Sequence, residues 1–261
     1  MCVDSTHGVT GYNFYLLSIL VINQYGKGLI VGWAISSREN FFIWKLLAQS
    51  LRPDSLRVKP EVLMSDDDNA SWNGLKLVWT SLKFKLLCHW HVKKNVRNNC
   101  IGTKCQVQMS TKTANSEQNE VEISTDLKST VQTSKFIYGT PIWELFYSLM
   151  KETDKETFFS MLSIFRKTCK AYNQQNLLQY FEKNYFPEHR IKQWATWFRK
   201  EMYGVQWLLN DNMHIESWHN YLKSVIMGRY KNVRVDKLLK ILVQAETIIF
   251  WKWTRYRFGT E

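Results

Sequence analysis

The first hundred residues alternate between short apolar stretches typical of buried strands and stretches whose apolar residues recur at helical spacing. Residues 11–23 are rich in Tyr, Phe, Leu, Val and Ile, and a turn at 24–28 separates them from a similar stretch at 29–36. This pattern predicts a β-hairpin. Further strands are predicted at 60–64 and 84–88, where apolar residues form a short run or alternate with polar ones. The order predicts a mixed α/β sheet.

Two helices are predicted between these strands. Apolar residues recur every three or four positions over 41–51, and Ser36 with Glu39 has the spacing of a capping box just before them. A second helix is predicted over about 69–79, directly after an acidic run that begins at Asp66. The acidic run therefore lies where a strand gives way to a helix.

The composition changes near residue 102. Residues 103–135 are dominated by Ser, Thr, Gln, Asn, Lys and Glu, which indicates a low-complexity loop. Every element predicted after it is a helix with an apolar stripe. These helices span 141–151, 155–172, 177–185, 188–203, 213–227 and 233–258. At these spacings the tryptophans of this half are expected in the core, with contact of one of them with a partner as the alternative: Trp194, Trp197, Trp207 and Trp218.

We therefore divide the chain into four parts. The predicted boundaries are 1–101 for the first part of an α/β core, 102–139 for the loop, 140–208 for a helical insertion and 209–261 for helices that return to the core.

Composition and charge narrow the class of protein. Hydrophobic residues make up 45% of the 261 positions, which argues against a disordered or collagen-like chain. No apolar run approaches the roughly 20 residues of a membrane-spanning helix, and we expect no signal peptide at Met1. Five cysteines at irregular spacing suit a reducing compartment. A net charge of +12 predicts a polyanionic partner, with a generally basic surface as the alternative.

Three acidic residues are candidates for a metal site. Asp4 stands in the first hydrophobic strand, Asp66 follows the strand at 60–64, and Glu216 lies on a predicted helix beside apolar neighbours. Two aspartates and a glutamate that converge would form an oxygen-rich site suited to Mg²⁺ or Mn²⁺. Two alternatives stay open: Asp66, Asp67 and Asp68 could cap the next helix, and Glu216 could be an ordinary surface residue.

A second group has the spacing of metal ligands. Cys88 and His91 are three residues apart, and Cys100 and Cys105 follow closely enough to complete four zinc ligands. The alternative is that Cys88 is a small buried strand residue with His91 packed beside it.

Four motifs that contain these residues follow one another along the chain. They are Asp4–His7, Met64–Asp66, Cys88–Asn95 and His214–Lys223. Together they resemble the transposase domain of Mutator-like elements, the MULE family of the DDE superfamily. The resemblance implies a ribonuclease-H-like mixed sheet, interrupted by an all-α insertion and followed by C-terminal helices.

The resemblance also assigns roles to residues. It implies that Asp4, Asp66 and Glu216 are the catalytic residues and hold Mg²⁺ or Mn²⁺, expected as two ions. His7, Cys88 and His91 are expected to organise the site near DNA, and zinc at Cys88 and His91 is not expected. The residues expected to bind DNA phosphates are Lys93, Lys94, Arg97 and Lys223.

The function implied is that of a magnesium-dependent DNA transposase. Such an enzyme cleaves DNA at an element's ends and joins the freed 3′-hydroxyl to target DNA. We expect it to act in the nucleus and to have no membrane partner. A homo-oligomer stays open. Family members usually carry flanking zinc modules that we do not find in these 261 residues. We therefore expect a fragment, a decayed copy or a domesticated domain. The alternatives are a non-catalytic DNA-binding or regulatory protein derived from a transposase, and a stand-alone nuclease.

Overall fold

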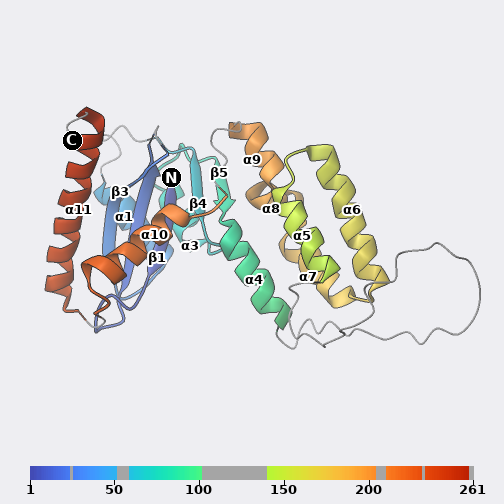
Figure 1. Ribbon diagram of the computed structural model, residues 1–261, viewed down its shortest axis with the longest axis horizontal. Helices are drawn as coiled ribbons and strands as arrows, with labels where there is room; N and C mark the ends of the chain where they lie inside the picture. Colours follow the sequence, from blue (N-terminus) through green and yellow to red (C-terminus); the bar gives the residue numbers. More distant parts are fainter. Residues whose placement is uncertain (24–25, 52–58, 102–139, 204–209, 231–232, 259–261) are drawn as a thin grey trace, which may run out of the picture. The chain divides into compact units, whose positions relative to one another are not determined.

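The computed structural model describes most of the chain in two compact units (Figure 1). The first unit consists of Met1–Val92 and Leu209–Glu261, and the second of Lys93–Leu208. The described residues are 1–23, 26–51, 59–101, 140–203, 210–230 and 233–258. The loop predicted at 102–139 and Trp207 therefore lie outside them. In the part of the chain that is described, no helix is long and apolar enough to cross a membrane.

A five-stranded sheet forms the centre of the first unit, in the order β3-β2-β1-β4-β5. The strands are β1 (Cys2–Thr6), β2 (Tyr15–Ile22), β3 (Gly28–Ser36), β4 (Val62–Ser65) and β5 (Phe84–Leu87). The first three pair antiparallel, whereas β4 pairs parallel with both β1 and β5. The predicted mixed α/β sheet is confirmed. The strand predicted from residue 11 starts only at Tyr15, because Asn13 has a φ of 55°, outside the β region.

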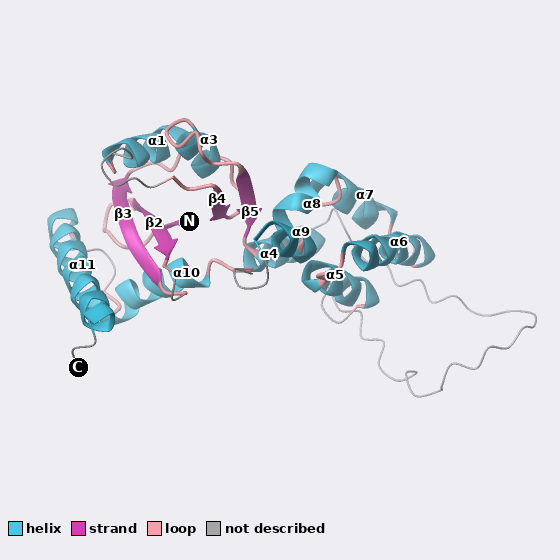
Figure 2. Ribbon diagram, turned by 90° about the horizontal axis from the view of Figure 1, so that it is seen from above, coloured by secondary structure: helices cyan, strands magenta, loops and turns pink. Residues whose placement is uncertain are grey.

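Helices cover both faces of this sheet (Figure 2). On one face, α1 (Phe41–Ser50) and α3 (Ala70–Lys76) pack on the sheet in a core that includes Leu17 and Trp44. On the other face lie α10 (Met213–Tyr221), the π-helical turn η2 (Leu222–Ile226) and α11 (Val235–Phe258). Leu16 belongs to this second core. Leu16 and Leu17 enter opposite cores because successive side chains of a strand point to opposite faces.

The predicted capping box before α1 is wrong. The N-cap residue is Asn40, whose Oδ1 accepts a hydrogen bond from the backbone N–H of Ile43 at 3.1 Å. Ser36 is still part of β3, so it is too early in the chain to cap a helix that begins at Phe41. Glu39 instead accepts a hydrogen bond from the Ser5 hydroxyl of β1.

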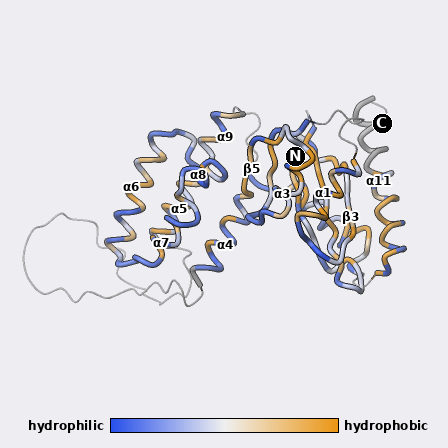
Figure 3. Tube along the Cα trace, turned by 180° about the vertical axis from the view of Figure 1, so that it is seen from behind, coloured by the Kyte–Doolittle hydropathy of each residue, from blue (hydrophilic) through white to orange (hydrophobic). Residues whose placement is uncertain are grey.

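The second unit is helical and has an aromatic core. Its helices are the larger part of α4 (His89–Ile101), then α5 (Pro141–Lys151), α6 (Lys155–Ala171), α7 (Gln175–Asn184), α8 (Glu188–Trp194) and α9 (Thr196–Tyr203). Phe146 is fully buried, and its ring centroid lies 4.8 Å from that of Phe181 and 5.7 Å from that of Trp194. Hydrophobic and hydrophilic residues alternate along helices such as α6, as one-sided burial requires (Figure 3).

Two sequence predictions about the helices can be compared with the structure. The single helix predicted over 188–203 is broken at Ala195, whose backbone is extended, so α8 and α9 are separate. The core positions predicted for Trp194, Trp197 and Trp218 are confirmed, since all three are buried.

The close approach of α1 and α3 generates a stability prediction. A Cβ added at Gly74 of α3 would lie 2.2 Å from the carbonyl oxygen of Phe41 and 2.8 Å from Cβ of Trp44. Gly74→Ala should therefore lower the free energy of unfolding by about 1–3 kcal/mol, since the two helices must move apart. Urea denaturation followed by circular dichroism measures this loss. Asn73→Ala, at an exposed position of the same helix, is the control and should change stability by less than about 0.5 kcal/mol. Equal effects of the two variants would contradict the packing argument.

Candidate functional site

The pairing of β1 with β4 brings the first two acidic candidates together. Cys2 stands opposite Met64 in this parallel pair, and continuing the register by two residues sets Asp4 beside Asp66. Neighbouring strands lie about 4.8 Å apart, and residues two positions further on point to the same face. Asp4 lies within β1, whereas Asp66 follows the last residue of β4.

The alternative interpretation of Asp66 as a helix cap is not supported. The N-cap residue of α3 is Asn69, whose own side chain makes no capping hydrogen bond. Oδ1 of Asp66 instead accepts a hydrogen bond from the backbone N–H of Asp68 at 3.2 Å, which closes a short turn after β4. This turn orients the Asp66 carboxylate at the end of the strand.

Glu216 reaches the same region from α10. Ile215 and Trp218 are buried and anchor this helix on the sheet, so Glu216 occupies the boundary between core and solvent. Its Oε1 lies 3.9 Å from Nδ1 of His91, in the first turn of α4. Glu216 is therefore half-buried beside a histidine, not an ordinary surface residue.

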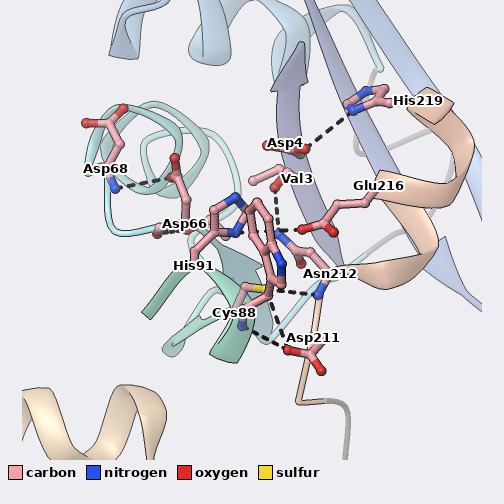
Figure 4. A network of polar contacts seen from close by, with 12 residues as sticks. Val3, Asp4, Asp66, Asp68, Cys88, His91, Asp211, Asn212, Glu216 and His219 are labelled. Atoms are coloured by element: carbon pink, nitrogen blue, oxygen red, sulfur yellow. Dashed lines mark hydrogen bonds and ion pairs between the residues drawn. The ribbon is translucent and has the colours of Figure 1, made fainter. Parts of the chain in front are cut away.

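The charge of Asp4 acts on both other carboxylates. Figure 4 shows Asp4, Asp66 and Glu216 together with His91 and Asn212. Burial raises the pKa of Asp66 above its ordinary value, and the negative charge of Asp4 adds to this rise. Burial also raises the pKa of Glu216, again with a contribution from Asp4. His91 partly counteracts both shifts. Asp4 thus interacts electrostatically with both other acids, and the three form a site with excess negative charge.

A histidine and a serine hold Asp4 in position. Nδ1 of His219, one turn after Glu216 on α10, lies 3.4 Å from Oδ2 of Asp4. The Nε2 atom of the same ring lies 3.0 Å from the hydroxyl of Ser18, which stands opposite Asp4 in the β1–β2 pair. The His219 side chain is almost fully buried, so these two partners fix its ring.

A junction of buried polar groups connects α10 with β1 and the start of α4. The backbone N–H of Asn212 donates to Sγ of Cys88 at 3.3 Å, and its side-chain amide donates to the carbonyl of Val3 at 3.4 Å. Next to it, Oδ1 of Asp211 accepts a hydrogen bond from the backbone N–H of Trp90 at 2.9 Å. Three segments far apart in sequence are thereby held at one point.

Cys88 and His91 both belong to this junction. Cys88 is fully buried between β5 and α4, and burial raises the pKa of its thiol to about 11. The ligand atoms of Cys88, His91 and Glu216 lie within 4.8 Å of one another. The two further zinc ligands predicted from the sequence were Cys100 and Cys105. Cys105 and the side chain of Cys100 lie outside the described residues.

The remaining predicted site residues lie in different surroundings. His7 is exposed after β1, and its ring packs edge-on against Tyr15. Lys223 lies in η2, and its Nζ donates a hydrogen bond to the hydroxyl of Thr6 at the end of β1. The other three predicted basic residues follow Val92 on α4 and belong to the second unit: Lys93, Lys94 and Arg97.

A further acid, Glu39, lies at this site, and local spacing did not indicate it. Burial raises the pKa of Glu39, and the charges of Asp66, Asp68 and Asp4 add to the rise. Its hydrogen bond with Ser5 holds it beside β1. Local spacing assigned Glu39 to a helix cap, and only the pairing of strands reveals its proximity to Asp4. Asp211 and Asn212 were also missed, although two such residues before a helix are a recognisable start signal.

Comparison with known proteins identifies one family. The family model of the MULE transposase domain matches residues 1–95, which include Asp4, Asp66, Cys88 and His91. The resemblance seen in the sequence is thus confirmed over this range, and Glu216 lies beyond it. No curated protein matches the chain.

The raised carboxyl pKa values predict how stability depends on pH. In metal-free protein, burial holds the pKa of Asp66 and Glu216 above their ordinary 3.8 and 4.5, so the folded state binds more protons than the unfolded chain. This contribution to the free energy of unfolding is complete below the ordinary values and is lost as the pH rises through the raised ones. The urea midpoint should therefore fall above pH 4.5, and Asp66→Asn or Glu216→Gln should flatten that fall. Asp236→Asn, at an exposed carboxyl whose pKa is lowered, should leave the fall in place. If the urea midpoint falls with pH as steeply in Asp66→Asn and Glu216→Gln as in the unmodified protein, the raised pKa values of these two carboxyls are contradicted.

The contacts of His219 predict a separate loss of stability. His219→Ala removes the partner of both Asp4 and Ser18 in a buried setting, which should cost about 1–3 kcal/mol of unfolding free energy. Chemical denaturation measures this loss of unfolding free energy. Asn220→Ala, at the next and exposed position of α10, is the control. If both variants are equally stable, His219 does not hold Asp4.

Proposed function

From the MULE transposase domain that residues 1–95 form, we propose that this chain is the catalytic core of a DDE-type transposase. Asp4, Asp66 and Glu216 are its catalytic residues, and DNA is its substrate. The reaction is cleavage of a phosphodiester at an element's end, followed by transfer of the freed 3′-hydroxyl to target DNA. Its site of action is the nucleus.

The observation that supports this proposal is the electrostatic interaction of Asp4 with both Asp66 and Glu216. Asp4 lies in β1, Asp66 directly follows the parallel neighbour β4, and Glu216 comes from a helix more than a hundred residues later. Burial raises the pKa of both Asp66 and Glu216, and the negative charge of Asp4 adds to both rises, so ionisation of these two carboxyls is costly without a bound cation. A divalent cation would supply that charge, so the donor set fits Mg²⁺ or Mn²⁺.

The sheet topology supports a ribonuclease-H-like fold. Three antiparallel strands are followed by two parallel ones in the order β3-β2-β1-β4-β5. The helices α5 to α9 occur between Asp66 and Glu216 in the chain, as expected for an insertion into such a core.

The chemistry is divided between the cation and the protein. Bound Mg²⁺ would supply Lewis acidity at the scissile phosphate and lower the pKa of the attacking water or hydroxyl. The protein's part is to hold three carboxylates in a fixed geometry. His219 orients Asp4, the turn at Asp68 orients Asp66, and the Asn212 junction sets the position of α10 and hence of Glu216.

Basic residues near the motifs would bind the DNA backbone. Lys223 follows Glu216 by seven residues and is attached to the end of β1 through Thr6. Lys94 and Arg97 are exposed on α4. Such cations neutralise phosphates without reading the base sequence, in keeping with the net charge of +12.

The test is a DNA-processing assay with purified chain and Mg²⁺. It follows nicking of a supercoiled plasmid and joining of a labelled oligonucleotide 3′ end to that plasmid. Asp4→Asn, Asp66→Asn and Glu216→Gln should each lower both activities by roughly a hundredfold or more, because each removes a ligand charge. Asp68→Asn is the matched control, since it keeps the backbone N–H that binds Asp66.

Other outcomes identify other functions. Activity that survives all three substitutions would overturn the assignment. Salt-dependent DNA binding without cleavage under any metal condition would identify a non-catalytic DNA-binding protein. Nicking without joining would identify a nuclease.

A further inference from the structure

A second set of potential ligands, of a different chemical kind, meets at the junction of β5, α4 and α10. Sγ of Cys88, a ring nitrogen of His91 and a carboxylate oxygen of Glu216 lie within 4.8 Å of one another. Cys88 immediately precedes α4, and His91 lies in its first turn, so residues three apart face the same side. Glu216 comes from the first turn of α10.

Two of these ligand atoms lack a partner among the described residues. Nδ1 of His91 and Oε1 of Glu216 are buried, and neither forms a hydrogen bond there. They face each other at 3.9 Å, which is too long for a hydrogen bond. Two ligands of one tetrahedral ion are separated by about 3.3 Å when each lies about 2.05 Å from the metal. A shift of about half an ångström would therefore let one cation bind both.

The third atom is already oriented toward them. Cys88 is fully buried, and its Sγ accepts a hydrogen bond from the backbone N–H of Asn212 at 3.3 Å. This bond fixes the sulfur beside the start of α10, the helix that carries Glu216. A cation at this point would receive a thiolate, an imidazole and a carboxylate.

We propose that Cys88, His91 and Glu216 bind a single zinc-class divalent cation, with the fourth coordination position open. A set with one sulfur, one nitrogen and one oxygen favours Zn²⁺ or Co²⁺ over Mg²⁺, which prefers oxygen ligands alone. The resemblance to the MULE family argued against zinc here, and spacing along the chain offered Cys100 and Cys105 as the further ligands. The tertiary structure supplies Glu216 as the third ligand instead.

The shared glutamate has a consequence that rests on the proposed function. Glu216 belongs both to the acidic set with Asp4 and Asp66 and to the set with Cys88 and His91. A carboxylate bound to zinc beside His91 is not available in the same orientation to the acidic set. Zinc would therefore compete with assembly of the magnesium site.

The experiment is a Co²⁺ titration of the purified full chain, followed by absorption spectroscopy in the absence of DNA. We expect a thiolate-to-cobalt charge-transfer band that saturates at one equivalent and disappears when Zn²⁺ is added. Cys88→Ser should remove the band, while Cys169→Ser, at a second buried cysteine, should keep it. Glu216→Gln should weaken cobalt binding by at least about tenfold, and because this side chain is half-buried the variant also serves if Cys88→Ser fails to fold.

The result that would overturn the proposal is the absence of a charge-transfer band, or a band of full intensity in Cys88→Ser. Asp66→Asn separates this inference from the proposed function. It should abolish DNA processing but leave the cobalt band and its affinity unchanged within about twofold, since Asp66 is not one of the three ligands. Loss of the band in Asp66→Asn would merge the two sites and contradict the proposal.

Discussion

The arrangement of the first unit depends on the buried amide of Asn212. The side-chain amide of Asn212 donates a hydrogen bond to the carbonyl of Val3 in β1, which constrains the position of this buried residue. Its backbone N–H donates to Sγ of Cys88 just before α4, and its backbone carbonyl accepts the N–H of Glu216. The first turn of α10 is thus attached to β1 and to the start of α4, which precede it by more than a hundred residues. Together with the His219–Asp4 contact, this junction fixes the position of Glu216 relative to Asp4.

Charge explains why such a rigid framework is needed. Burial, with the added charge of Asp4, raises the pKa of Asp66 and of Glu216, which lowers the stability of the metal-free fold at neutral pH. The buried contacts of His219 with Asp4 and Ser18 offset part of this cost on one side of the site. The charge of His91 lowers the pKa of both Asp66 and Glu216 and so offsets part of each rise. Glu216 belongs both to the oxygen-rich set with Asp4 and Asp66 and to the sulfur-containing set with Cys88 and His91. Which cation binds therefore depends on which of these two sets Glu216 completes.

Much of the fold follows from local patterns, and the exceptions have physical causes. Two apolar stretches separated by a turn predicted the hairpin of β2 and β3, because a strand between two cores buries side chains on both of its faces. The helix α4 was not predicted, since its residues were interpreted for their ligand spacing and its polar sequence has little apolar periodicity. The break at Ala195 was also missed. There the hydroxyl of Thr196 binds the carbonyl of Met150, a contact with a distant helix that no local window contains.

The sequence by itself determined which residue types stand at strand ends and helix starts, and therefore the motifs that resemble the MULE family. It indicated Asp4, Asp66, Glu216, Cys88 and His91 as candidates. Only the tertiary structure decided how they combine. The pairing of β1 with β4 brings the segments that carry Asp4 and Asp66 side by side, and the Asn212 junction brings Glu216 toward His91 and Cys88. These distances are set by strand pairing and by buried hydrogen bonds between segments up to two hundred residues apart. Periodicity and spacing carry no information about contacts of that range.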